Sequence, residues 1–371
     1  MNDDILIFCG TIPWVLFAFV VFKTSIKREN SKSLRLLLIF SLVFASVRYG
    51  IGYDYYAYMH AIEGDLGDYI LIRWEPLAQY LAHFCANVNS QLFFILTSFL
   101  SLFPIYYVIK RMSYSPQFSM GVYLLFPMFF LEAIGVIRNG VAYSVSLLTF
   151  YYLYKKNFKC ASVSYLLSIG FHYSSLITIL LLPFMYFFNR KQYHWLFYIV
   201  SFVGVKFILP IVISFTSSFS LAEIFLDKLE NENSGGVIMN ILVNAIGLFH
   251  LFNWDKISKY SSINKVYLSY INIGVCLWNL FLPISQTIAL RFSTFFLIYL
   301  ILLWPSFSYI FKGAFIRRRI MVGVLLIFSS SFILSLYSRY INNSKSHMAN
   351  IPYQVFFLNP DNRFDYIINS N

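Results

Sequence analysis

The sequence has too few charged residues for a water-soluble protein. Of its 371 residues, 12% are charged and 59% are hydrophobic, and the mean hydropathy is +0.66. Soluble globular domains contain roughly 25% charged and roughly 45–50% apolar residues. No polar stretch is long enough to build a separate soluble domain. The composition therefore excludes a soluble enzyme and predicts a single integral membrane domain over residues 1–371.

The signatures of several common chemistries are also missing. The four cysteines are scattered and form no C-x-x-C pair, which argues against a disulfide framework or a zinc site. The chain contains no H-E-x-x-H, Walker or G-x-S-x-G pattern. If the protein catalyses a reaction at the outer face of a cell membrane, where ATP is absent, the energy for that reaction must come from an activated donor.

What the sequence does contain is a succession of apolar runs, and about twenty apolar residues suffice to cross a bilayer as a helix. We predict an all-α, polytopic membrane helix bundle with about 12 transmembrane helices. A further short apolar piece, Pro76–Val88, predicts a re-entrant or interfacial helix. Two short helices are expected to meet at His172. The predicted spans are Ile5–Phe22, Leu34–Val47, Gln91–Ile109, Phe118–Ile134, Asn139–Tyr154, Cys160–Phe171, Ser174–Phe188, His194–Ile213, Val237–Asn253, Val266–Pro283, Ile288–Phe311 and Ile320–Tyr337.

The net charge of +12 could suggest nucleic acid, but the distribution of lysine and arginine argues for a membrane. Nineteen of the 28 basic residues fall in alternate short loops, which also hold two of the 16 acidic residues. The positive-inside rule makes these loops cytoplasmic. The opposite set is then extracytoplasmic. It comprises residues 48–90, which include the short helix, a second loop over 214–236, and a C-terminal tail over 338–371.

Several charged or titratable side chains fall at the predicted outer face, and charges at membrane depth are functional candidates. Each also has a structural explanation. Arg48 and Arg291 could extend toward the interface, His172 could cap a turn, and Glu75 could be a first-turn helix acid. Arg138 stands at a helix N-terminus, where a cation opposes the helix dipole unless an anion lies nearby. Glu132 is one candidate partner for Arg138.

Together these residues predict an anion site. Guanidinium groups match the oxygens of a diphosphate, so several arginines that face outward into a cavity suit such a ligand. A nearby carboxylate or imidazole suits a general base. Aromatic rings in the segment 53–58 and at Trp74 suit stacking against sugars.

The order of short motifs resembles the EpsG-type family of Wzy polysaccharide polymerases. The resemblance runs from about Phe40 to Tyr353. It rests on R-Y-G-I-G-Y-D-Y-Y-x-Y at Arg48–Tyr58, Glu75-Pro76, I-R-N-G at Ile137–Gly140, F-H-Y-S-S-L at Phe171–Leu176, A-L-R-F at Ala289–Phe292 and I-P-Y at Ile351–Tyr353.

This resemblance implies a metal-independent glycosyltransferase without a cofactor, at the outer face of the bacterial inner membrane. It would join oligosaccharide repeat units carried on undecaprenyl diphosphate into O-antigen, capsular or exopolysaccharide. Its expected partners are this lipid-linked oligosaccharide, membrane lipid, and a chain-length regulator and flippase of the same pathway, with no nucleic acid. In such an enzyme Arg138 and Arg291, with Arg48 in support, would hold the diphosphate and stabilise its charge. The catalytic candidates are His172, Glu75 and Asp54, in no fixed order. Tyr53, Tyr55 and Trp74 are the candidates for sugar binding.

Two other functions fit a helical membrane protein with cavity-facing cations. A flippase for the lipid-linked unit would need cations through the depth of a central cavity, whereas the candidate cations gather at one face. A membrane acyltransferase would need a cytoplasmic route for its thioester donor and a histidine near that face.

Overall fold

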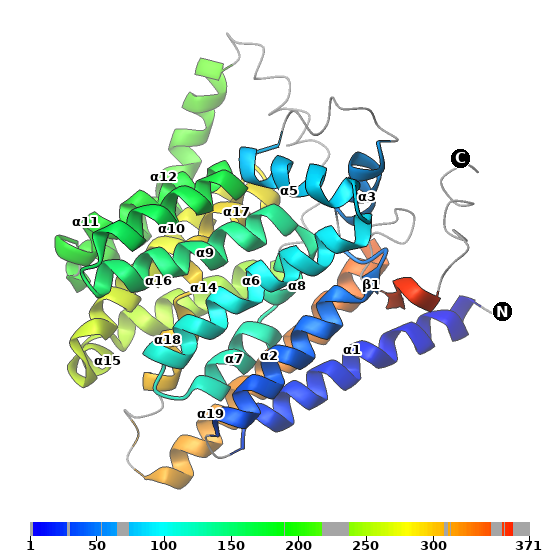
Figure 1. Cartoon of the computed structure of the whole chain (residues 1–371). Coiled ribbons are helices and arrows are strands. Elements are labelled where there is room, and N and C mark those ends of the chain that lie inside the picture. The colour runs from blue at the N-terminus through cyan, green and yellow to red at the C-terminus, as the bar shows by residue number, and fades with distance from the viewer. Residues whose placement is uncertain are drawn as a thin grey trace.

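The computed structural model is a helical bundle, which confirms the all-α prediction (Figure 1). It describes residues 3–27, 30–52, 54–64, 74–188, 190–216, 237–307, 313–342 and 353–358, together with residues 311 and 351. The elements are α1 (Asp3–Ser25), α2 (Ser31–Ser46), β1 (Arg48–Tyr49), α3 (Tyr55–Glu63), α5 (Pro76–Ala86), α6 (Ser90–Met112), α7 (Pro116–Leu125), α8 (Phe130–Gly135), α9 (Ile137–Tyr154), α10 (Phe158–Phe171), η1 (Tyr173–Leu180), α11 (Leu181–Tyr186), α12 (Lys191–Thr216), α14 (Val237–Phe252), α15 (Trp254–Tyr260), α16 (Ser262–Phe281), α17 (Gln286–Leu297), α18 (Leu300–Phe307), α19 (Ala314–Asn342), β2 (Gln354–Val355) and η3 (Phe356–Leu358).

Two helices of the described chain are long and apolar enough to cross a membrane alone, namely Ser90–Met112 and the part Ala314–Tyr337 of α19. The pair α17 and α18 qualifies as a third span if the 45° bend between them is accepted within one crossing. Other apolar helices, such as Phe158–Phe171, are shorter. The predicted number of about twelve crossings is therefore not confirmed. Many large apolar side chains nevertheless remain exposed, including Leu166 at 65%, as expected for a bundle surrounded by lipid.

Proline breaks one of the predicted spans. We expected one helix over Phe118–Ile134, but α7 ends at Leu125 and the six-residue α8 begins at Phe130. Phe126 adopts an extended conformation (φ −77°, ψ 120°), as the residue before a proline usually does, and Pro127 follows it. The prediction of a continuous helix here was wrong.

The predicted break at His172 is present. α10 ends at Phe171, and His172 itself is extended (φ −158°, ψ 125°) before η1 begins. The chain then turns back, since the hydroxyl of Tyr165 on α10 donates a hydrogen bond to the carbonyl of Leu176 at 3.1 Å. The predicted short helix at Pro76–Val88 is also present as α5.

Helix α9 lies at the centre of the bundle and packs against α6, α8, α10 and α17. Gly140 permits the close approach of α8, because a Cβ atom at this position would lie 2.6 Å from the Cα atom of Ala133. Gly52 plays a similar part in the loop after β1. It has a φ of +113°, and a Cβ there would lie 2.5 Å from the carbonyl oxygen of Ile134. Gly52 thus lies against the end of α8, and Gly140 lets α8 pack against the start of α9.

The chain returns to its first helices near the C-terminus. β1 and β2 pair antiparallel, with Arg48 opposite Val355 and Tyr49 opposite Gln354. The N–H of Tyr353 donates to the carbonyl of Gly10 at 3.0 Å.

The structure describes only parts of the two other segments predicted to be extracytoplasmic, the loop 214–236 and the tail 338–371. Residues 214–216 belong to α12, and the rest of the predicted 214–236 loop lies outside the described residues. In the predicted tail, α19 extends to Asn342.

Candidate functional site

The short helices α3 and α5, which follow Asp54 and Glu75, lie together at one end of the bundle (Figure 1). Arg138 is the second residue of α9, whereas Lys155 and Lys156 directly follow its last residue. An 18-residue helix is about 27 Å long. The site and the basic loops are therefore separated by about the thickness of a bilayer's hydrocarbon core, which is roughly 30 Å.

Glu75 is the centre of the site. Its Oε2 atom accepts a hydrogen bond and ion pair from the Nη1 group of Arg138. Its Oε1 atom lies 3.2 Å from Nδ1 of His172 and accepts a hydrogen bond of 3.2 Å from the N–H of Tyr173. Both oxygens of this carboxylate are thus engaged by groups from α9 and from the α10–η1 turn.

The dipeptide Glu75-Pro76 explains this orientation. Pro76 occupies the first turn of α5, where the missing N–H needs no partner. It also holds Glu75 in an extended conformation (φ −66°, ψ 149°). The carboxylate makes no capping bond to α5 and points to Arg138 and His172 instead. The sequence suggested Glu132 as a partner for Arg138, but the structure pairs Arg138 with Glu75.

Aromatic rings surround the guanidinium of Arg138. Its Nε donates a hydrogen bond to the hydroxyl of Tyr58 at 3.0 Å, and its Cζ atom lies 5.2 Å from the ring centroid of Trp74. Trp74 is only 9% exposed, so its ring supports the arginine. The Arg138 side chain keeps 22% of its surface accessible, which leaves part of the guanidinium open to a ligand.

Arg291 is the second cation of the site. It lies on α17, which packs against both η1 and α9. The side chain is half-buried, and its Nε is buried without a hydrogen-bond partner among the described residues. No carboxylate of the described chain forms an ion pair with it. A partly buried cation left unpaired in this way favours binding of an anion.

Asp54 is the second carboxylate, and it follows the Gly50–Gly52 turn. Its backbone N–H donates to the carbonyl of Gly135 at 3.3 Å, which holds it beside the start of α9. Burial raises the pKa of its carboxyl above the ordinary value, and the negative charge of Glu132 adds to that rise. The positive charges of Arg291, Arg138 and His172 oppose it. These charges show that Asp54, Arg291 and the Glu75 cluster share one electrostatic environment.

The pKa of the Glu75 carboxyl is shifted in the opposite direction to that of Asp54. Burial alone would raise the pKa of Glu75, but the hydrogen bond from His172 and the charge of Arg138 outweigh it and lower that pKa to about 2. Glu75 is therefore ionised at every physiological pH and acts as a permanent anion between two basic side chains.

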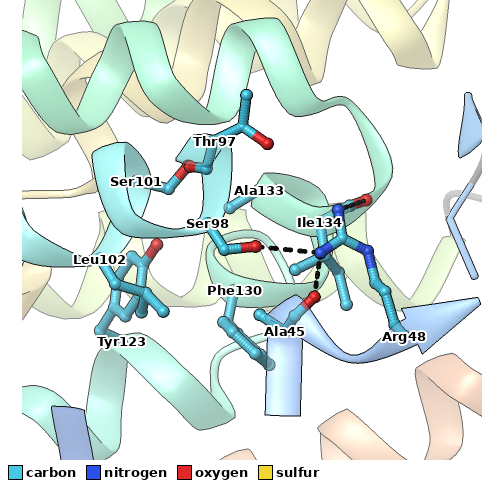
Figure 2. A pocket seen from close by; sticks show the side chains of 10 residues that line it. All are labelled: Ala45, Arg48, Thr97, Ser98, Ser101, Leu102, Tyr123, Phe130, Ala133 and Ile134. Atoms are coloured by element: carbon cyan, nitrogen blue, oxygen red, sulfur yellow. Dashed lines mark hydrogen bonds between the residues drawn. The ribbon is translucent and has the colours of Figure 1, made fainter. Parts of the chain in front are cut away.

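Arg48 lies apart from these groups, inside the protein. It is 1% exposed, and its guanidinium donates to the carbonyls of Ala45 and Ile134 and to the hydroxyl of Ser98 (Figure 2). The adjacent cavity has room for about one water molecule. The structure thus places Arg48, which we expected to support a bound diphosphate, in the protein interior, and a role for it in binding stays a prediction.

The aromatic candidates for sugar binding that the structure describes, Tyr55 and Trp74, are also buried. Tyr55 is fully buried, with its ring stacked on Phe94 at 4.1 Å and its hydroxyl donating to Gln91 at 3.0 Å. It therefore packs in the core and offers no face to a sugar. Trp74 supports Arg138, and Tyr53 lies outside the described residues. Sequence reasoning missed Tyr58 as a partner of Arg138, although its place in the tyrosine-rich motif was a signal.

Within the described part of the chain, no group of three or more histidine, cysteine, aspartate or glutamate side chains is arranged to hold a metal ion.

Comparison with known proteins agrees with the motifs and the helical architecture. No curated relative and no solved structure shows significant similarity to the chain. The sequence model of the EpsG family matches residues 32–355, which include every site residue described above. The chain therefore belongs to the EpsG family.

Proposed function

We propose that this protein is a polysaccharide polymerase that joins undecaprenyl-diphosphate-linked oligosaccharide repeat units at the outer face of the bacterial cytoplasmic membrane. Its family supports a polymerase-type role. The observation that carries the proposal is the guanidinium of Arg291, which forms no ion pair within the described chain and lies on a helix that packs against α9, the helix of the partly accessible Arg138. Two forked cations at one end of a membrane bundle suit the diphosphate of a lipid carrier better than a neutral sugar.

The reaction follows from the chemistry of that carrier. The growing chain, still attached to undecaprenyl diphosphate, is the activated donor. A hydroxyl oxygen of the incoming unit attacks the anomeric carbon, and the bond from this carbon to the diphosphate breaks. The diphosphate leaves with the electron pair, and Arg291 and Arg138 stabilise the negative charge that develops on it. No nucleotide or metal ion is required in this scheme.

A flippase for the same lipid-linked unit is the main alternative. It would bind the same diphosphate but would carry it across the membrane, which calls for cations along the whole path. The two cations of the site, Arg138 and Arg291, lie at the N-terminal end of α9 and on α17. The basic residues Lys155 and Lys156 follow the C-terminal end of α9, one helix length away. This arrangement favours a polymerase.

The test uses the purified protein in lipid nanodiscs or vesicles with lipid-linked repeat units isolated from cells that lack the chain. We expect the wild-type protein to form a ladder of longer glycans. Arg291→Ala should lower the rate about 100-fold or more, in the range for losing one group that stabilises transition-state charge. Arg291→Lys should restore little, because a point charge cannot replace the fork.

Arg111→Ala is the matched control. Arg111 is exposed and stacks on the ring of Tyr107 at 3.5 Å, at the opposite end of the bundle. Its removal should leave the glycan ladder unchanged. A wild-type protein that moves lipid-linked units between leaflets without lengthening them would identify a flippase. A full-length ladder with Arg291→Ala would remove Arg291 from the diphosphate site.

A further inference from the structure

The two carboxylates of the site stand in contrasting surroundings. Three groups contact Glu75, namely Arg138, Nδ1 of His172 and the N–H of Tyr173. The Asp54 carboxylate makes no ion pair or side-chain hydrogen bond with the described residues, and the N-cap position that it occupies on α3 receives no capping bond from it. It is also partly exposed. One carboxylate is thus fully engaged and the other is open.

This difference decides which carboxylate can accept a proton. To take one, Glu75 would have to give up the Arg138 ion pair or the His172 contact, and such pairing makes a carboxylate a weak base. Asp54 has no such side-chain contact with the described residues to give up. Its open oxygens can meet a hydroxyl as soon as the substrate binds, and it shares its surroundings with Arg291, the cation left free for the diphosphate.

His172 is held in place as well. Its Nδ1 lies 3.2 Å from Oε1 of Glu75, to which it donates when it carries the proton, and the N–H of Ser174 lies 3.3 Å from the same nitrogen, which accepts that N–H only in the other tautomer. The imidazole therefore joins α5 to the α10–η1 turn. With Arg138 on the other oxygen, Glu75 ties together α5, α9 and η1.

We propose that Asp54 is the general base of the transfer and that Glu75 is a positioning residue, which holds Arg138 and His172 in their working geometry. The inference rests on the proposed polymerase function. In the step, the proton of the attacking hydroxyl passes to the Asp54 carboxylate while its oxygen bonds to the anomeric carbon. The diphosphate departs toward Arg291 and Arg138, and the protonated Asp54 returns its proton to water.

The pH dependence of turnover separates the two roles. A base is active when deprotonated, so wild-type turnover should fall as the pH drops through the pKa of Asp54. Burial sets that pKa above the ordinary aspartate value. This fall in turnover at low pH is the acidic limb of the pH profile. Asp54→Asn should lose about 100-fold or more in kcat, retain affinity for the lipid-linked unit, and show no acidic limb.

Glu75→Gln should behave differently. The variant keeps Asp54 and hence the acidic limb, but the charge of Arg138 is no longer balanced. A stronger positive field lowers the pKa of Asp54, so the limb should move to lower pH. KM should rise because Arg138 loses its orientation. A role in stability alone would leave the position of the limb unchanged.

Each variant is first checked for membrane insertion and for an unchanged elution profile in detergent. Near-normal turnover with Asp54→Asn overturns the proposal. So does an acidic limb that survives in Asp54→Asn but disappears in His172→Gln, which would make His172 the base. If the wild-type protein does not lengthen lipid-linked glycans at all, the proposed function fails, and this inference fails with it.

Discussion

Arg48 shows how a charged side chain can be structural even where the sequence places it beside a functional motif. Its guanidinium bonds to two carbonyls and a hydroxyl from α2, α6 and α8, and its strand pairs with β2. The carbonyl of Ile134 that it contacts directly precedes Gly135, which accepts the backbone N–H of Asp54. Arg48 thus supports the turn that carries Asp54, although it does not reach the site.

We therefore expect Arg48→Ala to act on stability. The loss of hydrogen bonds from a buried charged donor should lower the free energy of unfolding by about 1.5–3 kcal/mol. Thermal unfolding in detergent measures this, with Arg111→Ala as the exposed control. Affinity for undecaprenyl diphosphate, measured well below the unfolding temperature, should stay near the wild-type value. A selective loss of that affinity with unchanged unfolding would restore Arg48 to the binding site.

At the scale of elements, the site depends on how closely α8 approaches α9. Arg138 and Gly140 lie on the same turn of α9, so the packing at Gly140 sets where the arginine stands. Pro127 ends the preceding helix and gives α8 its own direction. The I-R-N-G motif therefore contains both Arg138, the arginine of the candidate site, and Gly140, whose packing positions it.

A methyl group at this contact should displace the helix. In Gly140→Ala the new Cβ would meet backbone atoms of Ala133 at 2.6 and 2.8 Å, which cannot move as a flexible side chain can. We expect a cost of about 1–3 kcal/mol in unfolding free energy and a clear loss of polymer formation. Gly323→Ala is the control, because no atom lies within 4 Å of its added Cβ. It should stabilise α19 by about 0.5–1 kcal/mol. Equal effects of the two substitutions would refute the packing argument.

For the whole molecule, the central expectation is the orientation of the bundle. Nineteen of the 28 basic residues fall between predicted spans on one side of the membrane, so reporters fused after Lys110, Lys156, Lys259 or Arg318 should report a cytoplasmic location. Reporters within 48–75 or 214–236 should report the exterior. Paired alkaline phosphatase and fluorescent-protein fusions measure both outcomes. An exterior signal after Lys156 would put Arg138, at the other end of α9, on the cytoplasmic side and contradict a reaction at the outer face.

The sequence by itself determined the features that depend on neighbouring residues or on average composition. Apolar runs predicted a helical membrane bundle, His172 marked a chain reversal, and Glu75-Pro76 marked the start of a helix. Tertiary structure alone decided the partners. Arg138 pairs with Glu75, 63 residues away, and Arg48 and Tyr55 enter the core. Hydropathy and backbone preferences are local properties of the chain, whereas ion pairs and burial depend on which distant helices pack together.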